Sequence, residues 1–269
     1  MYLEYYGLKE FPFNVTPDPR FLYFSHQHRE AYDHIMYGIR QRKGFIQLTG
    51  EVGSGKTTLC RAVLGDLGDD VETALILNPT LTETQLIRAI LNDFGLDVQG
   101  RDRLDHIEKL NEFLLAKNHD NVNVAILIDE AQDLSPAVME QVRLLSNLET
   151  DQHKLIQIVM CGQPELDRRL SSPDLRQLRQ RITVRYNLLP LTLKDTAMYI
   201  GHRLEVAGSD GGVAFDSSAA REVFRYTHGS PRLINAVCDN ALLAGYVART
   251  REIDARCVKR SIQQLEGTG

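Results

Sequence analysis

The sequence of 269 residues contains no tryptophan and only four cysteines. These cysteines (Cys60, Cys161, Cys238 and Cys257) are far apart and form no CxxC or other ligand-like spacing, which argues against a metal centre or a disulfide framework. Cys60 and Cys161 lie in apolar surroundings, so we expect them to be small core residues. We expect reduced thiols, as in a cytoplasmic protein.

Long hydrophobic runs are also absent. No apolar stretch approaches the roughly 20 residues that a helix needs to cross a bilayer. The first residues, Met1 to Glu4, lack the basic region and the apolar core of a signal peptide. We therefore expect a cytoplasmic location, with any recruitment to the inner face of the inner membrane made through a partner or through a segment outside this sequence.

The sequence has no strong excess of one charge either. A net charge of −5, with 43% hydrophobic and 25% charged residues, is typical of a soluble globular protein. This balance gives no overall support for a nucleic-acid binder, although it is compatible with a local basic patch. The length exceeds that of one average domain, which favours a two-part architecture.

Aromatic residues and three prolines crowd the first 25 residues. This composition predicts an extended arm, residues 1–25, that packs its aromatic side chains against a larger body. Ser25 is the expected N-cap of a helix over about residues 26–41, in which apolar residues recur at helical spacing.

Short apolar runs then alternate with amphipathic segments, and this alternation predicts a parallel sheet with helices on both faces. Five strands are expected, at residues 45–49, 73–77, 122–128, 155–161 and 182–186. Helices are expected between them at residues 83–94, 104–117 and 136–147. Strand signals stop near residue 190, and helices are expected at residues 193–207, 217–227, 231–248 and 254–265. The predicted fold is an α/β nucleotide-binding core, residues 26–189, followed by a small all-helical lid, residues 190–269.

The most specific motif follows the first of these strands. Residues 50–58 match G-x-x-x-x-G-K-[ST] between a strand and a helix, which is the context of a phosphate-binding P-loop (Walker A). Its glycines let successive backbone N–H groups point into one concavity, Lys56 would reach the β- and γ-phosphates, and Thr57 would offer its hydroxyl to Mg²⁺. The predicted nucleotide-binding residues of the loop are Gly50, Glu51, Val52, Gly53, Ser54, Gly55, Lys56, Thr57 and Thr58.

An apolar strand that ends in Asp129 and Glu130 follows about 70 residues later, as in a Walker B element. Asp129 would hold Mg²⁺, and Glu130 would orient and polarise the attacking water. The next residues, Ala131, Gln132 and Asp133, carry no phosphoacceptor-site signature, so ATP hydrolysis is favoured over a kinase.

Gln163 lies at the tip of the expected strand 155–161, which would place its side chain between the two Walker strands near the γ-phosphate. The alternative is a turn residue that is extended because Pro164 follows.

Residues 174–182 form a basic helical stretch that ends at the last strand. An arginine there can reach the nucleotide of a neighbouring subunit and neutralise charge on the transferred phosphate. Arg181 is the preferred candidate for this role and Arg179 the second. A solvated basic helix face is the alternative for either residue.

Arg232 follows Pro231 at the start of a helix in the lid region. If the lid folds over the nucleotide, Arg232 would contact the γ-phosphate and distinguish ATP from ADP. The alternative is a structural ion pair with an acid such as Asp239.

The ordered set of P-loop, Asp-Glu strand, polar strand tip, interfacial arginine and G-x-P-R helix resembles the AAA+ ATPases over roughly residues 25–265. The resemblance is more specific in three segments, which look like the general-secretion ATPase A family with its ExeA-like and MshM-like members. These segments are the N-terminal run from Tyr6 to Tyr23, GQPEL at 162–166 and GSPRLIN at 229–235.

This resemblance implies a homo-oligomeric, Mg²⁺-dependent ATPase that supports assembly or operation of an envelope secretion or pilus system, with an inner-membrane or envelope protein as partner. The alternative is an ATP-gated scaffold, or a DNA-associated regulator of the transposition-helper type, for which salt-sensitive DNA binding would be diagnostic. Residues 21–25 are candidates for an adenine contact or for core aromatics. The sequence leaves open the particular system, the number of subunits and the choice between motor and timer.

Overall fold

The computed structural model describes residues 2–77, 80–97, 102–150 and 154–267. The chain divides into two compact units. One consists of residues 29–50 and 59–188, and we call it the sheet unit. The other, which we call the helical unit, combines the residues up to 28, residues 51–58 and the residues from 189 onward.

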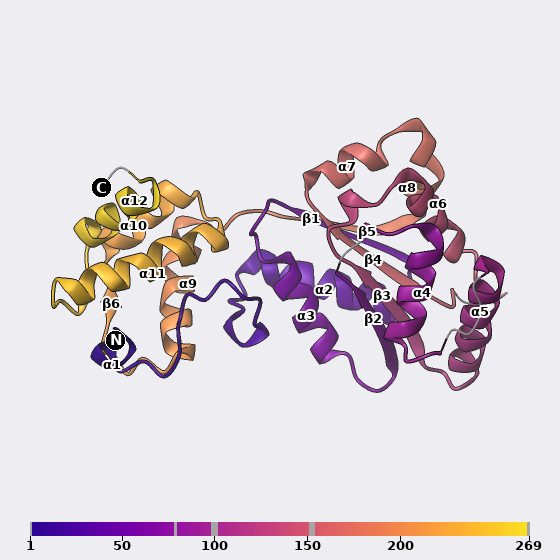
Figure 1. Ribbon diagram of the computed structural model, residues 1–269, viewed down its shortest axis with the longest axis horizontal. Coiled ribbons are helices and arrows are strands. Elements are labelled where there is room, and N and C mark those ends of the chain that lie inside the picture. Colours follow the sequence, from indigo (N-terminus) through magenta and orange to yellow (C-terminus); the bar gives the residue numbers. More distant parts are fainter. Residues whose placement is uncertain (1, 78–79, 98–101, 151–153, 268–269) are drawn as a thin grey trace. The chain divides into compact units, whose positions relative to one another are not determined.

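The sheet unit is built on five strands in the order β2-β3-β4-β1-β5, and every neighbouring pair is parallel (Figure 1). The strands are β1 (Phe45–Gly50), β2 (Val71–Ile76), β3 (Asn123–Ile128), β4 (Gln157–Gly162) and β5 (Ile182–Leu188). The predicted five-stranded parallel sheet is confirmed, with strand ends that differ from expectation by up to two residues.

Helices cover both faces of this sheet. Figure 1 shows α2 and α3 on one side and α4, α5 and α6 on the other. The helices that lie wholly or mostly in this unit are α2 (His26–Arg40), α3 (Lys56–Asp66), α4 (Glu83–Asp93), α5 (Arg103–His119), α6 (Pro136–Leu145), α7 (Pro164–Leu170) and α8 (Arg176–Arg181). Two short 3₁₀ turns, η2 (Ala131–Asp133) and η3 (Pro173–Leu175), complete it.

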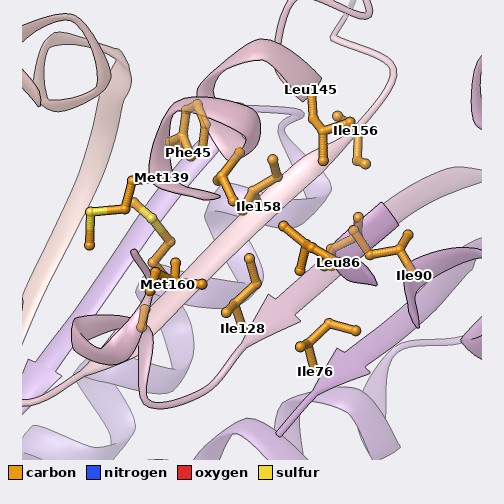
Figure 2. Close-up of a cluster of buried hydrophobic side chains, with 14 of the residues drawn as sticks. Phe45, Ile76, Leu86, Ile90, Ile128, Met139, Leu145, Ile156, Ile158 and Met160 are labelled. Carbon is orange, nitrogen blue, oxygen red and sulfur yellow. The ribbon is translucent and has the colours of Figure 1, made fainter. Parts of the chain in front are cut away.

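Side-chain alternation on β3 explains why both faces are covered. Val124, Ile126 and Ile128 join the large core cluster with α4, α5 and α6, whereas Ala125 and Leu127 are buried outside that cluster. A strand that is apolar on both sides must be covered on both sides. Figure 2 shows part of the cluster, in which Leu86 and Ile90 of α4 pack near Ile76 and Ile128. On the other face, the thiols of Cys60 and Cys161 lie 2.9 Å apart.

Side-chain caps define where several helices begin. The Thr82 hydroxyl accepts a hydrogen bond from the Gln85 backbone N–H, and the Gln85 side-chain oxygen accepts one from the Thr82 backbone N–H, so α4 starts with a complete capping box. Ser135 caps α6, and Pro136 takes the first helical position, where its missing N–H has no cost.

The helical unit contains four longer helices, α9 (Leu193–Val206), α10 (Ser217–Thr227), α11 (Pro231–Val247) and α12 (Ala255–Leu265). It also contains two short strands, β6 (Ala214–Phe215) and β7 (Glu252–Ile253), which pair in parallel. The expectation that strands stop near residue 190 is therefore wrong. Two residues are too short for an alternating pattern, so periodicity did not reveal these strands.

The N-terminal segment is only partly extended, contrary to prediction. It begins with a short helix, α1 (Tyr2–Tyr6), and has a 3₁₀ turn, η1 (Pro19–Phe21). Its aromatic residues do pack as expected, because Tyr2, Tyr6, Phe13 and Phe21 are buried in the core of the helical unit. The Tyr6 hydroxyl donates to the backbone oxygen of Leu242, 3.0 Å away.

Arg203 of α9 holds the middle of this segment. Its buried guanidinium donates to the backbone oxygens of Pro12 and Asn14 and to the Tyr199 hydroxyl, and it lies 4.8 Å from the centre of the Phe21 ring. A buried arginine that satisfies carbonyl groups in this way fixes an otherwise irregular chain. In the part of the chain that the structure describes, no helix combines the length and the apolar character required of a bilayer span.

Candidate nucleotide-binding site

The P-loop turns between the end of β1 and the start of α3. Gly53 and Gly55 have φ values of +74° and +97°, which L-residues rarely adopt, so the backbone requires glycine at these two positions of the motif. Lys56 is 6% exposed, and its Nζ donates to the backbone oxygen of Glu51 at 3.0 Å, which draws the loop together.

These residues fit a nucleoside triphosphate. The hydroxyl oxygen of Ser54 is buried and has no hydrogen-bond partner among the described residues, in a loop that also offers backbone N–H donors and the cation of Lys56. The hydroxyl of Thr57 and the carboxylate of Asp129 are the hard oxygen donors that Mg²⁺ prefers. The start of α3 also directs its positive end toward the loop.

His28 supports the P-loop, a role that sequence reasoning missed. The backbone oxygen of Ser54 can only accept, so the His28 Nε2–H must donate to it across 3.1 Å. Nδ1 then accepts from the Ser25 hydroxyl at 2.7 Å. Burial lowers the pKa of His28 and keeps the ring neutral, in agreement with this tautomer.

Ser25 also accepts a hydrogen bond from the His28 backbone at 3.3 Å, so its predicted role as an N-cap is confirmed. The spacing Ser25-x-x-His28, at the start of the helix that precedes the P-loop strand, was the available signal for His28. It was overlooked because contact with residue 54 depends on tertiary packing.

Arg232 lies in the first turn of α11, after Pro231. Its backbone N–H donates to the backbone oxygen of Gly53 at 3.2 Å, so the start of α11 contacts the P-loop within the helical unit. Its side chain is exposed. Asp239, the alternative partner considered for it, accepts from the Tyr2 hydroxyl. The sensing role of Arg232 remains a prediction.

The acidic pair lies at the carboxyl end of β3. Asp129 is 5% exposed, and its Oδ1 accepts from the Glu130 backbone N–H at 2.9 Å. Glu130 has a left-handed backbone, with φ +50° and ψ +38°. This conformation costs an L-residue about 1–2 kcal/mol, so the surrounding contacts must hold Glu130 in place.

Gln163 follows the last residue of β4, and β4 lies between β1 and β3, as expected. Its side-chain amide donates to Glu130 Oε2 across 3.2 Å. The tips of β3 and β4 are therefore joined through side chains. The proposed contact of Gln163 with a phosphate stays a prediction.

Gln132, which was not a predicted site residue, joins the same group. Its Nε2 donates to Glu130 Oε2 at 2.8 Å, and its Oε1 accepts from the Gln163 backbone N–H at 3.0 Å. The only sequence signal was its place two residues after Glu130.

Arg181 has an intrachain role that the sequence did not indicate. Its guanidinium donates to the Ser146 hydroxyl and to Asn147 Oδ1, each at 2.6 Å, just after the last residue of α6. Arg179, the second candidate, is exposed. Among the described residues, neither arginine makes a hydrogen bond or an ion pair to Glu130. The action of either arginine on the nucleotide of another subunit remains a prediction.

The chain is similar to known proteins in sequence and in fold. The family model described as "AAA domain" matches residues 39–170. General secretion pathway protein A of Aeromonas hydrophila is 46% identical over 254 residues, which are 94% of this chain and 46% of that protein. The chain thus spans less than half the length of this relative.

Several solved structures share the fold. Cdc6p from Pyrobaculum aerophilum has a TM-score of 0.71 at 16% identity, with 94% of this chain and 70% of that chain covered. The ORC2 protein of Aeropyrum pernix has a TM-score of 0.68 at 15% identity, with 94% and 71% covered. The Thermotoga maritima RuvB branch migration motor has a TM-score of 0.60 at 18% identity, with 88% and 69% covered.

At such identities the solved structures show the fold alone, which is the AAA+ fold with a C-terminal helical part. The family model and the relative from Aeromonas hydrophila, which is 46% identical, identify the family. The chain is an AAA domain protein of the general secretion pathway protein A (ExeA-like) family.

Proposed function

We propose that this protein is a Mg²⁺-dependent ATPase that works as a homo-oligomer in an envelope secretion or pilus system. The observation that carries the hydrolytic part is the position of the Glu130 carboxylate. It is held by two amide groups at the end of β3, at the same edge of the sheet from which β1 leads into the P-loop.

The residues of the site have separate roles in binding and hydrolysis. The backbone N–H groups of residues 51–58 and the Lys56 cation bind the phosphate chain, and Thr57 and Asp129 supply oxygen ligands for the metal. When bound, Mg²⁺ neutralises negative charge on the phosphates. Glu130 orients a water molecule and accepts its proton as the water oxygen bonds to the γ-phosphorus and the bond to the ADP oxygen breaks.

Phosphate release from ATP, with and without Mg²⁺, tests this function. Glu130→Gln should bind ATP normally and lose turnover by about 10²- to 10⁴-fold, because the amide cannot accept the proton. Lys56→Ala should lose binding. Normal turnover by Glu130→Gln would refute the assignment of the base.

The oligomeric part of the proposal rests on the arginines near the end of α8. Arg179 is exposed and available to a neighbouring subunit, whereas Arg181 would have to leave Ser146 and Asn147. Sizing Glu130→Gln with ATP and with ADP tests assembly. Mixing Arg179→Ala or Arg181→Ala with Glu130→Gln then tests sharing: two inactive variants that regain turnover together identify an arginine that acts on another subunit.

The proposed pathway follows from the name of the Aeromonas hydrophila relative. We place the protein in the cytoplasm, recruited to the inner face of the inner membrane by an envelope assembly protein. Deleting the gene should impair protein secretion or piliation, and Lys56→Ala should fail to restore it. Full restoration by Lys56→Ala would show that nucleotide binding is not needed for the pathway.

A further inference from the structure

We propose that Gln132 is a positioning residue for hydrolysis, which fixes the Glu130 carboxylate and ties it to the tip of β4. This inference rests on the proposed ATPase function and adds a residue to it.

Both the nitrogen and the oxygen of the Gln132 side-chain amide make hydrogen bonds at the site. Nε2 donates to Glu130 Oε2 at 2.8 Å and also lies 3.3 Å from Asp133 Oδ2. Oε1 accepts from the Gln163 backbone N–H at 3.0 Å. The side chain is only 7% exposed, so water competes little for these bonds and its amide cannot rotate without leaving a buried group unsatisfied.

The two amide donors meet the same carboxylate oxygen. Gln132 Nε2 and Gln163 Nε2 both donate to Glu130 Oε2. Oε1 of Glu130 makes no hydrogen bond to the described part of the chain. The arrangement therefore orients the carboxylate through one oxygen and leaves the other for a water molecule.

Neighbouring residues keep Gln132 itself in place. The guanidinium of Arg169 on α7 donates to the backbone oxygens of Gln132 and Leu134, which fixes the η2 turn on α7. At Gly162, a Cβ atom would lie 2.9 Å from Gln132 Oε1, so any other residue at position 162 would displace the amide from its present place.

These contacts connect the two strand tips in a closed set: Glu130 to Gln132, Gln132 to the backbone of Gln163, and the side chain of Gln163 back to Glu130. A displacement of the β4 tip must therefore move the carboxylate. Since the left-handed backbone of Glu130 is costly, these bonds also explain why that conformation persists.

Steady-state kinetics with separate nucleotide binding measurements test the proposal. Gln132→Ala should lower kcat by about 10- to 100-fold, since small misplacements of a reacting group have effects of this size, while the Kd for ATP stays unchanged. Gln132→Glu keeps an acceptor for the Gln163 N–H but adds a second carboxylate beside Glu130. Its kcat should therefore fall, and the acidic limb of its pH–kcat profile should move to higher pH.

Gln157→Ala is the matched control. Gln157 is also a buried glutamine with three side-chain hydrogen bonds, to Gly44, Asn123 and Lys154, but it lies at the start of β4, at the opposite edge of the sheet. Gln157→Ala should destabilise the fold and leave the pH–kcat profile unchanged. If Gln132→Ala and Gln157→Ala have the same kcat, or if Gln132→Glu keeps the wild-type pH profile, Gln132 is not a positioning residue.

A second measurement does not depend on turnover. The free energies of unfolding of Gln132→Ala, Glu130→Ala and the double variant should be non-additive, because the two side chains are bonded. Strict additivity would overturn the proposal. Absence of ATPase activity in the wild type would instead refute the proposed function. The unfolding measurements would still show whether the Gln132 and Glu130 side chains are coupled.

Discussion

Gly53→Ala is the sharpest test of the contact between the P-loop and α11. Gly53 has a φ of +74°, which costs a residue with a Cβ about 1–2 kcal/mol. The added Cβ would also lie 2.5 Å from the Cβ and 3.3 Å from the Cδ of Arg232. Relief of such an overlap in packed structure costs about 1–3 kcal/mol.

The combined cost of about 2–5 kcal/mol must be met whenever the loop adopts its phosphate-binding shape. We therefore expect the Kd for ATP to rise at least about 30-fold, the factor that corresponds to the lower limit. Titration of a fluorescent ATP analogue measures it. Since the chain has no tryptophan, unfolding is followed by circular dichroism.

Two variants control this experiment. Gly65→Ala changes a glycine of α3 that has open space around it, so its Kd should match the wild type and its helix should gain a little stability. Adding Arg232→Gly to Gly53→Ala removes the overlap but not the unfavourable φ, so affinity for ADP, which lacks the γ-phosphate that Arg232 is predicted to contact, should return in part. A Kd for Gly53→Ala within about threefold of wild type would refute the reasoning from this contact.

Two further predictions concern stability. Arg203→Ala should lower the free energy of unfolding by about 1–3 kcal/mol, because it leaves the buried backbone oxygen of Pro12 without its donor, and it should expose the N-terminal segment to protease; the exposed Arg256→Ala is its control, and equal stability of the two variants would contradict the anchoring role. Burial lowers the pKa of His28, so as the pH falls the imidazole becomes protonated in the unfolded chain before it does in the folded protein. The free energy of unfolding should therefore decrease as the pH drops below about 6.5. In urea unfolding, His28→Asn should reduce this dependence of the free energy of unfolding on pH. The remaining dependence is due to His202, whose pKa is also lowered by burial. An unchanged pH dependence would show that His28 does not contribute.

Local sequence was sufficient for the main architecture. Apolar runs such as β3 are continuous because both faces of a parallel sheet are buried, and polar residues mark their ends. The P-loop was equally clear, since its conformation depends on glycines and on a lysine at fixed spacing within nine residues. The same holds for the acidic pair that follows β3.

Features that depend on distant residues were not predictable in this way. The short strands β6 and β7 pair across 36 residues, and neither is long enough to show a period. The three-residue turn between Glu130 and Leu134 has no pattern that reveals its anchoring to Arg169. Arg181 was recognised as basic and helical, but its attachment to Ser146 and Asn147 depends on how α6 and α8 pack.

The sequence by itself thus determined the fold family, the phosphate-binding loop and the acidic strand end, because each is encoded by neighbouring residues. Only the tertiary structure decided which side chains hold them: His28 under the P-loop, α11 against Gly53, and Gln132 between Glu130 and Gln163. The physical reason is that a hydrogen bond between buried groups depends on distance and direction, and chain folding sets both across many residues.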